Sequence, residues 1–281
     1  MSRPEPPELR TRGRWPPPDG SRVAIVGSRR PSPYGEAVAE QLAADLARAG
    51  VVVISGLALG IDAAAHRGAL AGGGVTVAVM GTGVDVVYPP AHSRLAEEIL
   101  AAGGALVSQF PDGTAPRRHN FPARNWTMAA LSDLVVVVEA AEGSGALITA
   151  EAALHLHKEV LAVPGSVFSP LSVGTHGLIR DGAGLVQNAR DVLAALGATQ
   201  EVLDDPLAPP KGLGFGPLPG RDGIVAHLSD VLPLSAAEVA RKLQLPVADV
   251  LARLTALELD GAVRRHHDGY VRALRHGSKR A

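Results

Sequence analysis

Short apolar runs rich in β-branched residues alternate with alanine- and leucine-rich amphipathic stretches along most of this chain, and this alternation restricts the fold more than any other feature. The runs are RVAIVG (22–27), VVVISG (51–56), VTVAVMG (75–81), ALVSQF (105–110), LVVVVEA (134–140), EVLAVPG (159–165) and GLVQ (184–187). Apolar strands separated by helices are typical of a parallel sheet that is covered on both faces. We therefore predict an α/β fold over residues 22–199, with a doubly wound, mainly parallel, Rossmann-like sheet.

The stretches between these runs have helical periodicity. They predict helices over 35–49, 61–71, 92–102, 124–131, 146–157 and 189–196. Between the strand at 159–165 and about residue 175 we expect a loop, because no periodic pattern is evident there.

Four further segments differ in composition from this domain. Residues 1–21 are rich in Pro and Arg and contain too little apolar surface to fold alone, so we expect a disordered or loosely docked arm. Residues 200–219 are rich in Pro and Gly without a periodic pattern, which is typical of a linker. Residues 220–275 show three helical patterns and a hairpin that turns at Asp268-Gly269, which predicts a small winged helix-turn-helix domain. A basic tail occupies 276–281.

Composition narrows the possible classes of protein. The chain has 281 residues, of which 46% are hydrophobic, and a net charge of −1, which is ordinary for a globular protein. No run approaches the roughly 20 apolar residues of a membrane helix, and the first residues lack a signal-peptide pattern. We therefore expect a cytoplasmic protein with no membrane partner. The lack of cysteine excludes disulfides and thiolate metal sites.

Glycine-rich loops follow nearly all of the predicted strands. In a doubly wound sheet these loops form the ligand crevice, and glycine lets backbone N–H groups approach an anion closely. The candidate binding residues in these loops and the helix turns after them are Gly27, Ser28, Arg29, Arg30, Gly56, Gly81, Thr82, Ser144, Gly145 and Thr149. Several such loops at one edge of the sheet predict an anion-binding site.

The segment 109–127, QFPDGTAPRRHNFPARNWT, gathers guanidinium, aromatic and amide groups. Single-stranded nucleic acid needs cations for its phosphates and flat surfaces for its unstacked bases, and Arg118 with Phe121 supplies both. The candidates in this segment are Arg117, Arg118, Asn120, Phe121, Arg124 and Asn125. Because the net charge gives no global attraction to nucleic acid, binding would depend on such local clusters. The alternative is that the aromatic rings fill the core and the arginines are only solvated.

No motif for a cofactor, a metal or a reaction stands out. The first loop lacks G-x-G-x-x-G, the second strand ends in Ser55-Gly56 where a ribose-binding acid would stand, and no Gly-Lys-Ser/Thr sequence occurs. The histidines are scattered without metal-binding spacing. Asp62, beside a glycine turn, is more typical of a brace than of a general base. We therefore expect no cofactor, no metal and no catalytic residue.

The winged domain allows two interpretations. Its expected recognition helix, 247–259, carries Asp249 and Glu258 against Arg253 alone, whereas helices that enter the major groove are usually basic. This favours a protein-interaction module over a duplex reader, while the basic wing and tail leave weak DNA contact open.

Taken together, the motifs resemble those of the DNA-processing protein A family, also called DprA or Smf. The matching sequence motifs are VAIVGSR (23–29), SGLALGID (55–62), GTGVDVVYPP (81–90), HNFPARN (119–125), SGALITA (144–150), AVPG (162–165) and GTHGLI (174–179). They follow the order of the family over about 22–195. The chain departs from the family at Trp126, where an arginine is common, and at Gly143, where an arginine commonly precedes SGSLITA.

The resemblance implies a non-catalytic protein that binds single-stranded DNA, protects incoming DNA, and helps load the RecA recombinase during natural transformation. It implies that Arg29 and Arg118 bind phosphates and that Phe121 stacks on a base. It also implies a homodimer formed through the Rossmann-like domain. We expect the apolar stretch 177–186 to contribute to that interface through Leu178, Ile179 and Leu185.

Two functions of other classes compete with this interpretation. A nucleotide-acting Rossmann enzyme, such as a nucleoside-monophosphate phosphoribohydrolase, would need a catalytic acid after a glycine turn, and Glu151 lies too far along its predicted helix. A transcription factor that uses the winged helix is disfavoured by the acidic residues of 247–259.

Overall fold

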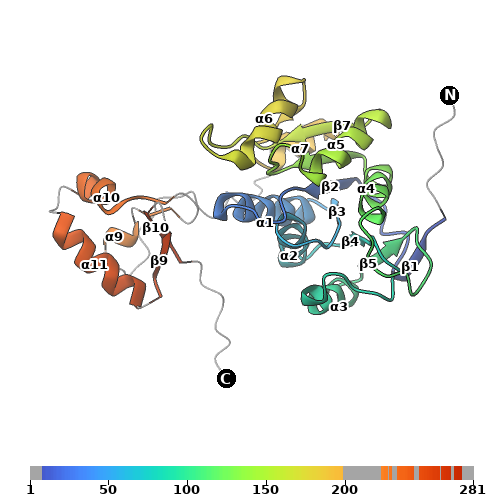
Figure 1. Ribbon diagram of the computed structural model, residues 1–281, viewed down its shortest axis with the longest axis horizontal. Coiled ribbons are helices and arrows are strands. Elements are labelled where there is room, and N and C mark those ends of the chain that lie inside the picture. The colour runs from blue at the N-terminus through green and yellow to red at the C-terminus, as the bar shows by residue number, and fades with distance from the viewer. Residues whose placement is uncertain are drawn as a thin grey trace. The chain divides into compact units, whose positions relative to one another are not determined.

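The computed structural model describes residues 8–198, 223–226, 228–229, 233–243, 247–259, 261–266 and 269–273. It divides into two compact units, Met1–Leu207 and Ala208–Ala281 (Figure 1). The division falls within the stretch predicted to be a linker, whose residues 200–219 lie outside the described residues.

The first unit is built on an eight-stranded sheet. Its strands are β1 (Arg10–Gly13), β2 (Arg22–Val26), β3 (Val52–Ser55), β4 (Thr76–Val79), β5 (Ala105–Ser108), β6 (Leu134–Val137), β7 (Glu159–Ala162) and β8 (Gly184–Leu185), in the order β1-β5-β4-β3-β2-β6-β7-β8. All neighbouring pairs are parallel except β1 and β5. The strand order reverses between β2 and β6, so the loops after these strands diverge and leave a crevice at the carboxyl edge of the sheet. The predicted doubly wound α/β fold is confirmed.

Helices cover both faces of this sheet. They are α1 (Pro33–Arg48), α2 (Ile61–Ala71), α3 (Ser93–Ala101), α4 (Asn120–Leu131), α5 (Gly145–His155), α6 (Val173–Arg180) and α7 (Ala189–Ala195), with short 3₁₀ turns at Pro90–His92 and Pro170–Ser172. Because side chains alternate along a strand, Val23 and Ile25 of β2 pack with α1, α2 and α7, while Ala24 and Val26 pack with α4 and α5. No helix within the described residues is long and apolar enough to cross a membrane.

The N-terminal segment differs from the expected arm. Instead of being disordered or loosely docked, residues 10–13 form strand β1, which pairs antiparallel with β5. Gly13 makes this possible, because its φ is +97° and a Cβ there would lie 2.4 Å from the Gly104 carbonyl oxygen. Trp15 then packs against the apolar cluster under α4 and α5. A strand of four polar or small residues carries little apolar signal, so its pairing was not visible in the sequence.

Two helices also differ from the sequence-based prediction. Helix α4 begins at Asn120, four residues before the predicted start, because Pro122 stands in the first turn, where a missing N–H costs no helical hydrogen bond. Helix α6 lies partly within the expected loop. It contains Gly174, whose Cβ would come 2.7 Å from the Ala140 carbonyl oxygen. Glycine is thus required for packing there and weakens the helical signal.

The second unit has the predicted winged-helix architecture. Its elements are α9 (Gly223–Ala226), α10 (Ala236–Leu243), α11 (Val247–Leu259) and the antiparallel pair β9 (Val263–His266) and β10 (Gly269–Arg272). Ser235 and Glu238 form a capping box at the start of α10, since each side chain accepts a hydrogen bond from the other's backbone N–H. Of the predicted turn, Asp268 lies outside the described residues, as does the tail 276–281.

Candidate nucleic-acid interface

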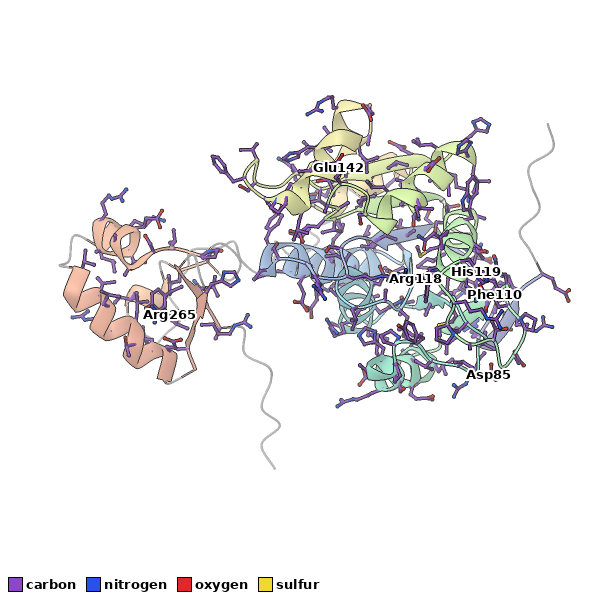
Figure 2. The ribbon with its side chains drawn as sticks, in the orientation of Figure 1. Asp85, Phe110, Arg118, His119, Glu142 and Arg265 are labelled. Carbon is purple, nitrogen blue, oxygen red and sulfur yellow. The ribbon has the colours of Figure 1, made fainter. Side chains whose placement is uncertain are left out.

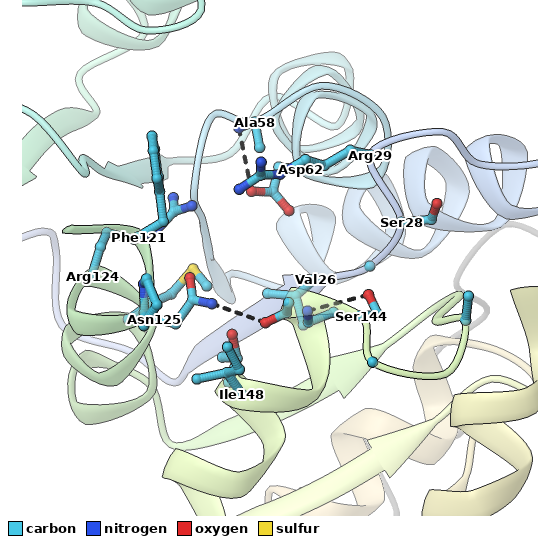
Figure 3. Close-up of a pocket in the computed structure, with 18 of the residues that line it drawn as sticks. Val26, Ser28, Arg29, Ala58, Asp62, Phe121, Arg124, Asn125, Ser144 and Ile148 are labelled. Atoms are coloured by element: carbon cyan, nitrogen blue, oxygen red, sulfur yellow. Dashed lines mark hydrogen bonds between the residues drawn. The ribbon is translucent and has the colours of Figure 1, made fainter. Parts of the chain in front are cut away.

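A cleft of about 600 Å³ opens at the carboxyl ends of β2, β3 and β6, between α4 and α5 (Figure 3). Ten of the predicted binding residues line it: Gly27, Ser28, Arg29, Arg118, Phe121, Arg124, Asn125, Ser144, Gly145 and Thr149. Six do not, namely Arg30, Gly56, Gly81, Thr82, Arg117 and Asn120. The topology therefore brings predicted residues from three separate segments, 27–29, 118–125 and 144–149, to one surface, as the crevice rule predicts.

One part of the cleft is a stack of a cation and two aromatic rings. The Arg29 guanidinium carbon lies 5.3 Å from the centroid of the Phe121 ring. The ring of Tyr88 lies 5.8 Å from that of Phe121 at an angle of 42°. An exposed arginine held over a ring is oriented without losing its ability to bind an anion. We call Arg29, Arg118 and Phe121 the rim of the cleft.

Glycine is needed beneath this stack for space. A Cβ on Gly81 would lie 2.8 Å from the Phe121 ring, so Gly81 provides room for the ring and does not itself line the cleft. In the loop after β3, Gly60 has a φ of +78°, and a Cβ there would lie 2.4 Å from the Ser28 carbonyl oxygen in the loop after β2. The same oxygen accepts a hydrogen bond of 3.1 Å from the Ile61 N–H. The start of α2 thus fixes the loop that carries Arg29.

Arg124 occupies a different environment from Arg29. Its side chain is 3% exposed, and Nη1 donates hydrogen bonds to the carbonyl oxygens of Gly56 and, at 2.9 Å, Val79. A Cβ on Gly56 would overlap this guanidinium. Arg124 therefore joins the ends of β3 and β4 while it lines the cleft, and its contact with DNA stays a prediction. Gly56 leaves the space that this side chain occupies, and its contact with DNA likewise stays a prediction.

Asp62 lies beside this buried arginine. Burial raises the pKa of the Asp62 carboxyl, while the charge of Arg124 and a 3.3 Å hydrogen bond from the Ala58 N–H oppose that shift. Figure 3 shows Arg29 extending toward Asp62 as well. The carboxylate therefore balances guanidinium charge in the cleft, in keeping with the brace predicted from its glycine turn. We call Asp62, Arg124 and Asn125 the floor of the cleft.

Most of the predicted amide and hydroxyl ligands form hydrogen bonds with backbone groups. Asn120 Nδ2 donates to the Gly81 carbonyl oxygen at 3.0 Å, and Asn125 Nδ2 donates to that of Gly145 at 2.9 Å. The buried Thr82 hydroxyl donates to the Val86 carbonyl oxygen at 2.6 Å. Asn120 and Thr82 therefore brace loops and do not line the cleft, and their contact with DNA stays a prediction. Asn125 lines the cleft while it fixes the start of α5.

The start of α5 faces the cleft with free donor capacity. Ser144 caps the helix, its hydroxyl accepting a 3.4 Å hydrogen bond from the Ala146 N–H, and Gly145 is the first helical residue. Unpaired N–H groups and the helix dipole at such a position attract anions. The exposed Arg118 lines the same cleft, and Figure 2 marks it beside His119 at the start of α4. Arg30 and Arg117 are exposed near this surface but outside the lining.

Sequence reasoning missed several lining residues, among them Tyr88, Met128 and Glu142. Tyr88 belongs to the motif GTGVDVVYPP, and its aromatic side chain in a loop after a predicted strand could have indicated a role in the cleft. Met128 belongs to the apolar face of α4 and carried no separate signal. Glu142 is an exposed acid in the loop after β6, next to Gly143.

Several buried titratable side chains outside the floor are engaged by hydroxyl groups. Glu139 accepts hydrogen bonds from the backbone and hydroxyl of Ser32, and burial raises the pKa of its carboxyl. His66 Nδ1 lies 2.7 Å from Thr76 Oγ1. Glu151, the acid considered for a phosphoribohydrolase, is exposed and does not line the cleft. Within the described ranges, no group of three His, Cys, Asp or Glu residues is placed to hold a metal ion.

The residues expected at a dimer interface lie away from the cleft. Leu178 and Ile179 are partly buried on α6, and Leu185 is exposed on the edge strand β8. The loop after β7 adds Phe168, which is 92% exposed and was not singled out from the sequence.

Residues 2–197 match the DNA recombination-mediator protein A family, and residues 208–269 match the DprA winged helix domain. The chain belongs to the DNA recombination-mediator protein A family. This confirms the resemblance seen in its motifs.

Relatives are known from several bacteria. The chain is 41% identical to the protein Smf of Escherichia coli K12 over 90% of its own length and 68% of that protein. It is 41% identical to a putative DNA processing protein DprA of Mycobacterium tuberculosis H37Rv over 92% of its length and 66% of the relative. It thus spans about two thirds of these relatives.

Two solved structures of family members share the fold of the first unit. DNA processing protein A from Streptococcus pneumoniae is 45% identical, with a TM-score of 0.59 over 62% of this chain and 61% of that one. The protein from Helicobacter pylori, described for its single-stranded DNA binding mode, is 32% identical, with a TM-score of 0.61 over 68% of this chain and 87% of that one.

Proposed function

We propose that this chain is a non-catalytic single-stranded DNA-binding protein that protects incoming DNA and helps load the RecA recombinase during natural transformation and in repair. The observation that carries the proposal is the Arg29 guanidinium over the Phe121 ring at the mouth of the cleft. A cation for phosphate and an aromatic face for a base, side by side, are what unpaired strands require. The binding of single-stranded DNA by the Helicobacter pylori relative supports it.

The bound strand follows the rim. Arg29 and Arg118 contact phosphates, with the hydroxyls of Ser28 and Ser144 and the Gly145 N–H as further donors. Phe121 stacks on one base. Arg30 and Arg117, exposed on either side, attract the strand from outside the cleft. The floor and the remaining glycines hold these groups in place and contribute no phosphate contact of their own.

The polar groups of the cleft support a non-catalytic role. Its carboxylates are Asp62, which lies against Arg124, and Glu142, which is exposed in a loop. The Ser55 hydroxyl beside Asp62 donates to the Ile25 carbonyl oxygen at 2.7 Å, which supports a bracing role for this pair over general acid or base catalysis.

Dimerisation and the RecA partnership rest chiefly on family membership. Leu185 and Phe168 are exposed on this domain, and large exposed apolar side chains support a homodimer formed through it. The protein acts in the cytoplasm, where RecA and incoming strands meet.

The test is fluorescence anisotropy of labelled single-stranded and duplex oligonucleotides at several salt concentrations. The parent protein should prefer the single strand. The double variant Arg29→Ala/Arg118→Ala should bind more weakly and should lower the magnitude of the log–log salt slope by about 1.4, because each lost phosphate contact on a single strand removes about 0.7.

A matched control is available on the same domain. Arg94 and Arg190 are exposed and do not line the cleft, so Arg94→Ala/Arg190→Ala removes the same charge elsewhere. Equal losses in both double variants, or a preference of the parent for duplex DNA, would refute the proposed site.

A further inference from the structure

A second aromatic side chain of α4 is exposed outside the lining of the cleft. Trp126 is 41% exposed, although tryptophan side chains are on average highly buried. Its ring lies 5.6 Å from the ring of His155 on α5, at an angle of 34°. Contact with this neighbouring ring restricts the orientation of the indole while much of its surface stays open to solvent. The indole can therefore accept a further flat group without being reoriented.

This aromatic pair lies on helix faces that continue from the cleft. Pro122 lines the cleft and stands four residues before Trp126 on α4, so the two side chains share a face. Ile148 also lines the cleft, and His155 follows it two turns later on the same face of α5. The two helices pack against each other (Figure 1). A strand that leaves the cleft along them reaches Trp126 about 6 Å beyond Pro122.

The charges of this surface favour a base over a phosphate as the occupant. Helices α4 and α5 contain one arginine and no lysine, and that arginine, Arg124, is buried. The exposed Glu151 lies 3.9 Å from His155 Nε2, so its carboxylate offsets any charge on that ring. Along these two helices, which the structure describes completely, no exposed arginine or lysine is available to a phosphate. The indole remains as the binding group, and bases of an unpaired strand stack on such rings whatever their sequence.

We propose that Trp126 is a second stacking surface, which binds a base of the strand where the strand leaves the cleft. His155 is a positioning residue, because it restrains the indole ring. Phe121 and Trp126 are five residues apart on α4, so they project roughly 140° apart around the helix axis and contact different nucleotides. This inference rests on the proposed function and extends the binding surface beyond the cleft.

The tryptophan content of the chain allows a direct test. The two tryptophans are Trp15 and Trp126, and Trp15 packs against the core, so the fluorescence of the Trp15→Phe variant reports Trp126 alone. A base that stacks on an indole ring lies in contact with it and quenches its emission. We expect a long oligothymidylate to quench most of this emission, with the same midpoint as anisotropy of a labelled strand. Unchanged emission at saturation would overturn the proposal.

A second test measures affinity and needs no change at Trp15. Trp126→Leu keeps an apolar side chain and removes the ring, so we expect it to bind the long strand roughly fivefold more weakly, the lower end of the range for one lost stack. The log–log salt slope should stay that of the parent, because no phosphate contact is lost. Leu154→Ala is the matched control, since Leu154 is 57% exposed on α5 beside His155. It should bind like the parent.

The length of the strand separates this surface from the cleft. With progressively shorter oligothymidylates, the effect of Trp126→Leu should disappear at a length where Arg29→Ala/Arg118→Ala still weakens binding. An equal effect of Trp126→Leu at every length would overturn the proposal, because Trp126 would then support the cleft.

The outcomes also distinguish this proposal from the proposed function. If the parent prefers single strands through Arg29 and Arg118 while Trp126→Leu binds long strands like the parent, the second stacking surface is refuted and the proposed function stands. The exposed indole would then be left to a protein partner. Failure of the parent to prefer single strands would remove the proposed function and the second stacking surface together.

Discussion

The rim and the floor of the cleft use arginine for opposite purposes. Arg29 is exposed above the Phe121 ring, whereas Arg124 is buried against the carbonyl oxygens of Gly56 and Val79. Arg29 stands in a glycine-containing loop and Arg124 in an arginine-rich segment. Both guanidinium groups interact electrostatically with the Asp62 carboxyl. The comparison shows that the number of acceptors within reach decides the role: a guanidinium paired with carbonyl oxygens supports the fold, and one without them is available to a ligand.

The largest effect should come from breaking the floor. Arg124→Met leaves Asp62 as an uncompensated buried charge and unpairs two carbonyl oxygens, so we expect the free energy of unfolding to fall by about 3–5 kcal/mol. Urea denaturation measures this. Asp62→Asn in the same chain should recover part of the loss, because the buried charge is removed.

Arg94→Met is the matched control. Its side chain is 91% exposed, so its effect on unfolding should stay within about 0.5 kcal/mol. If Arg124→Met folded with the parent's stability but lost DNA binding, Arg124 would be a ligand of the rim kind and the comparison would fail.

A smaller effect concerns pH and a group one helical turn beyond Asp62. Burial lowers the pKa of His66 from 6.5 to about 3, so below pH 6.5 the unfolded chain binds a proton that the folded chain does not. The contribution of neutral His66 to the free energy of unfolding is therefore fully present above pH 6.5 and is lost as the pH falls toward 3. Between pH 6.5 and 5 the loss should be about 2 kcal/mol.

His66→Gln should abolish this part of the pH dependence in urea denaturation, whereas His119→Gln, at an exposed position, should retain it. A parent protein whose stability was flat between these pH values would contradict the burial argument.

The smallest effect should be at the rim ring. Phe121→Leu keeps an apolar side chain but removes the flat face, and we expect DNA affinity to fall by about 1 kcal/mol, the lower end of the range for lost base stacking. Anisotropy titration measures it. Phe110→Leu is the control, because Phe110 lies in the same segment, is partly buried and does not line the cleft. Similar losses in both variants would show that the segment as a whole, and not the ring, matters.

The sequence was sufficient for the fold because strand and helix periods are local properties. The apolar runs at 22–27 and 134–140 became the adjacent central strands β2 and β6, and glycines at their ends located the cleft. The sequence was insufficient where a contact between residues far apart in the chain decides the role of a side chain. Nothing near Arg124 in the sequence indicates the carbonyl of Gly56, which is 68 residues away.

The same limit applies to glycine. At Gly81 the residue type suggested approach of an anion, but its neighbour is the Phe121 ring. Both roles require a missing side chain, so the sequence pattern is the same. Only the three-dimensional neighbour distinguishes them.

Strand β1 has a consequence for association of the sheet. Without it, β5 would present its unpaired backbone groups and an apolar surface at the boundary of the sheet, where another chain can add a strand. With β1 in place the boundary strand carries Arg10 and Arg12, and Arg12 is paired with Glu97 at 2.9 Å. Charged boundary strands resist the addition of further strands. The short N-terminal segment thus acts as a guard against aggregation in a protein whose sheet would otherwise end in an open apolar edge.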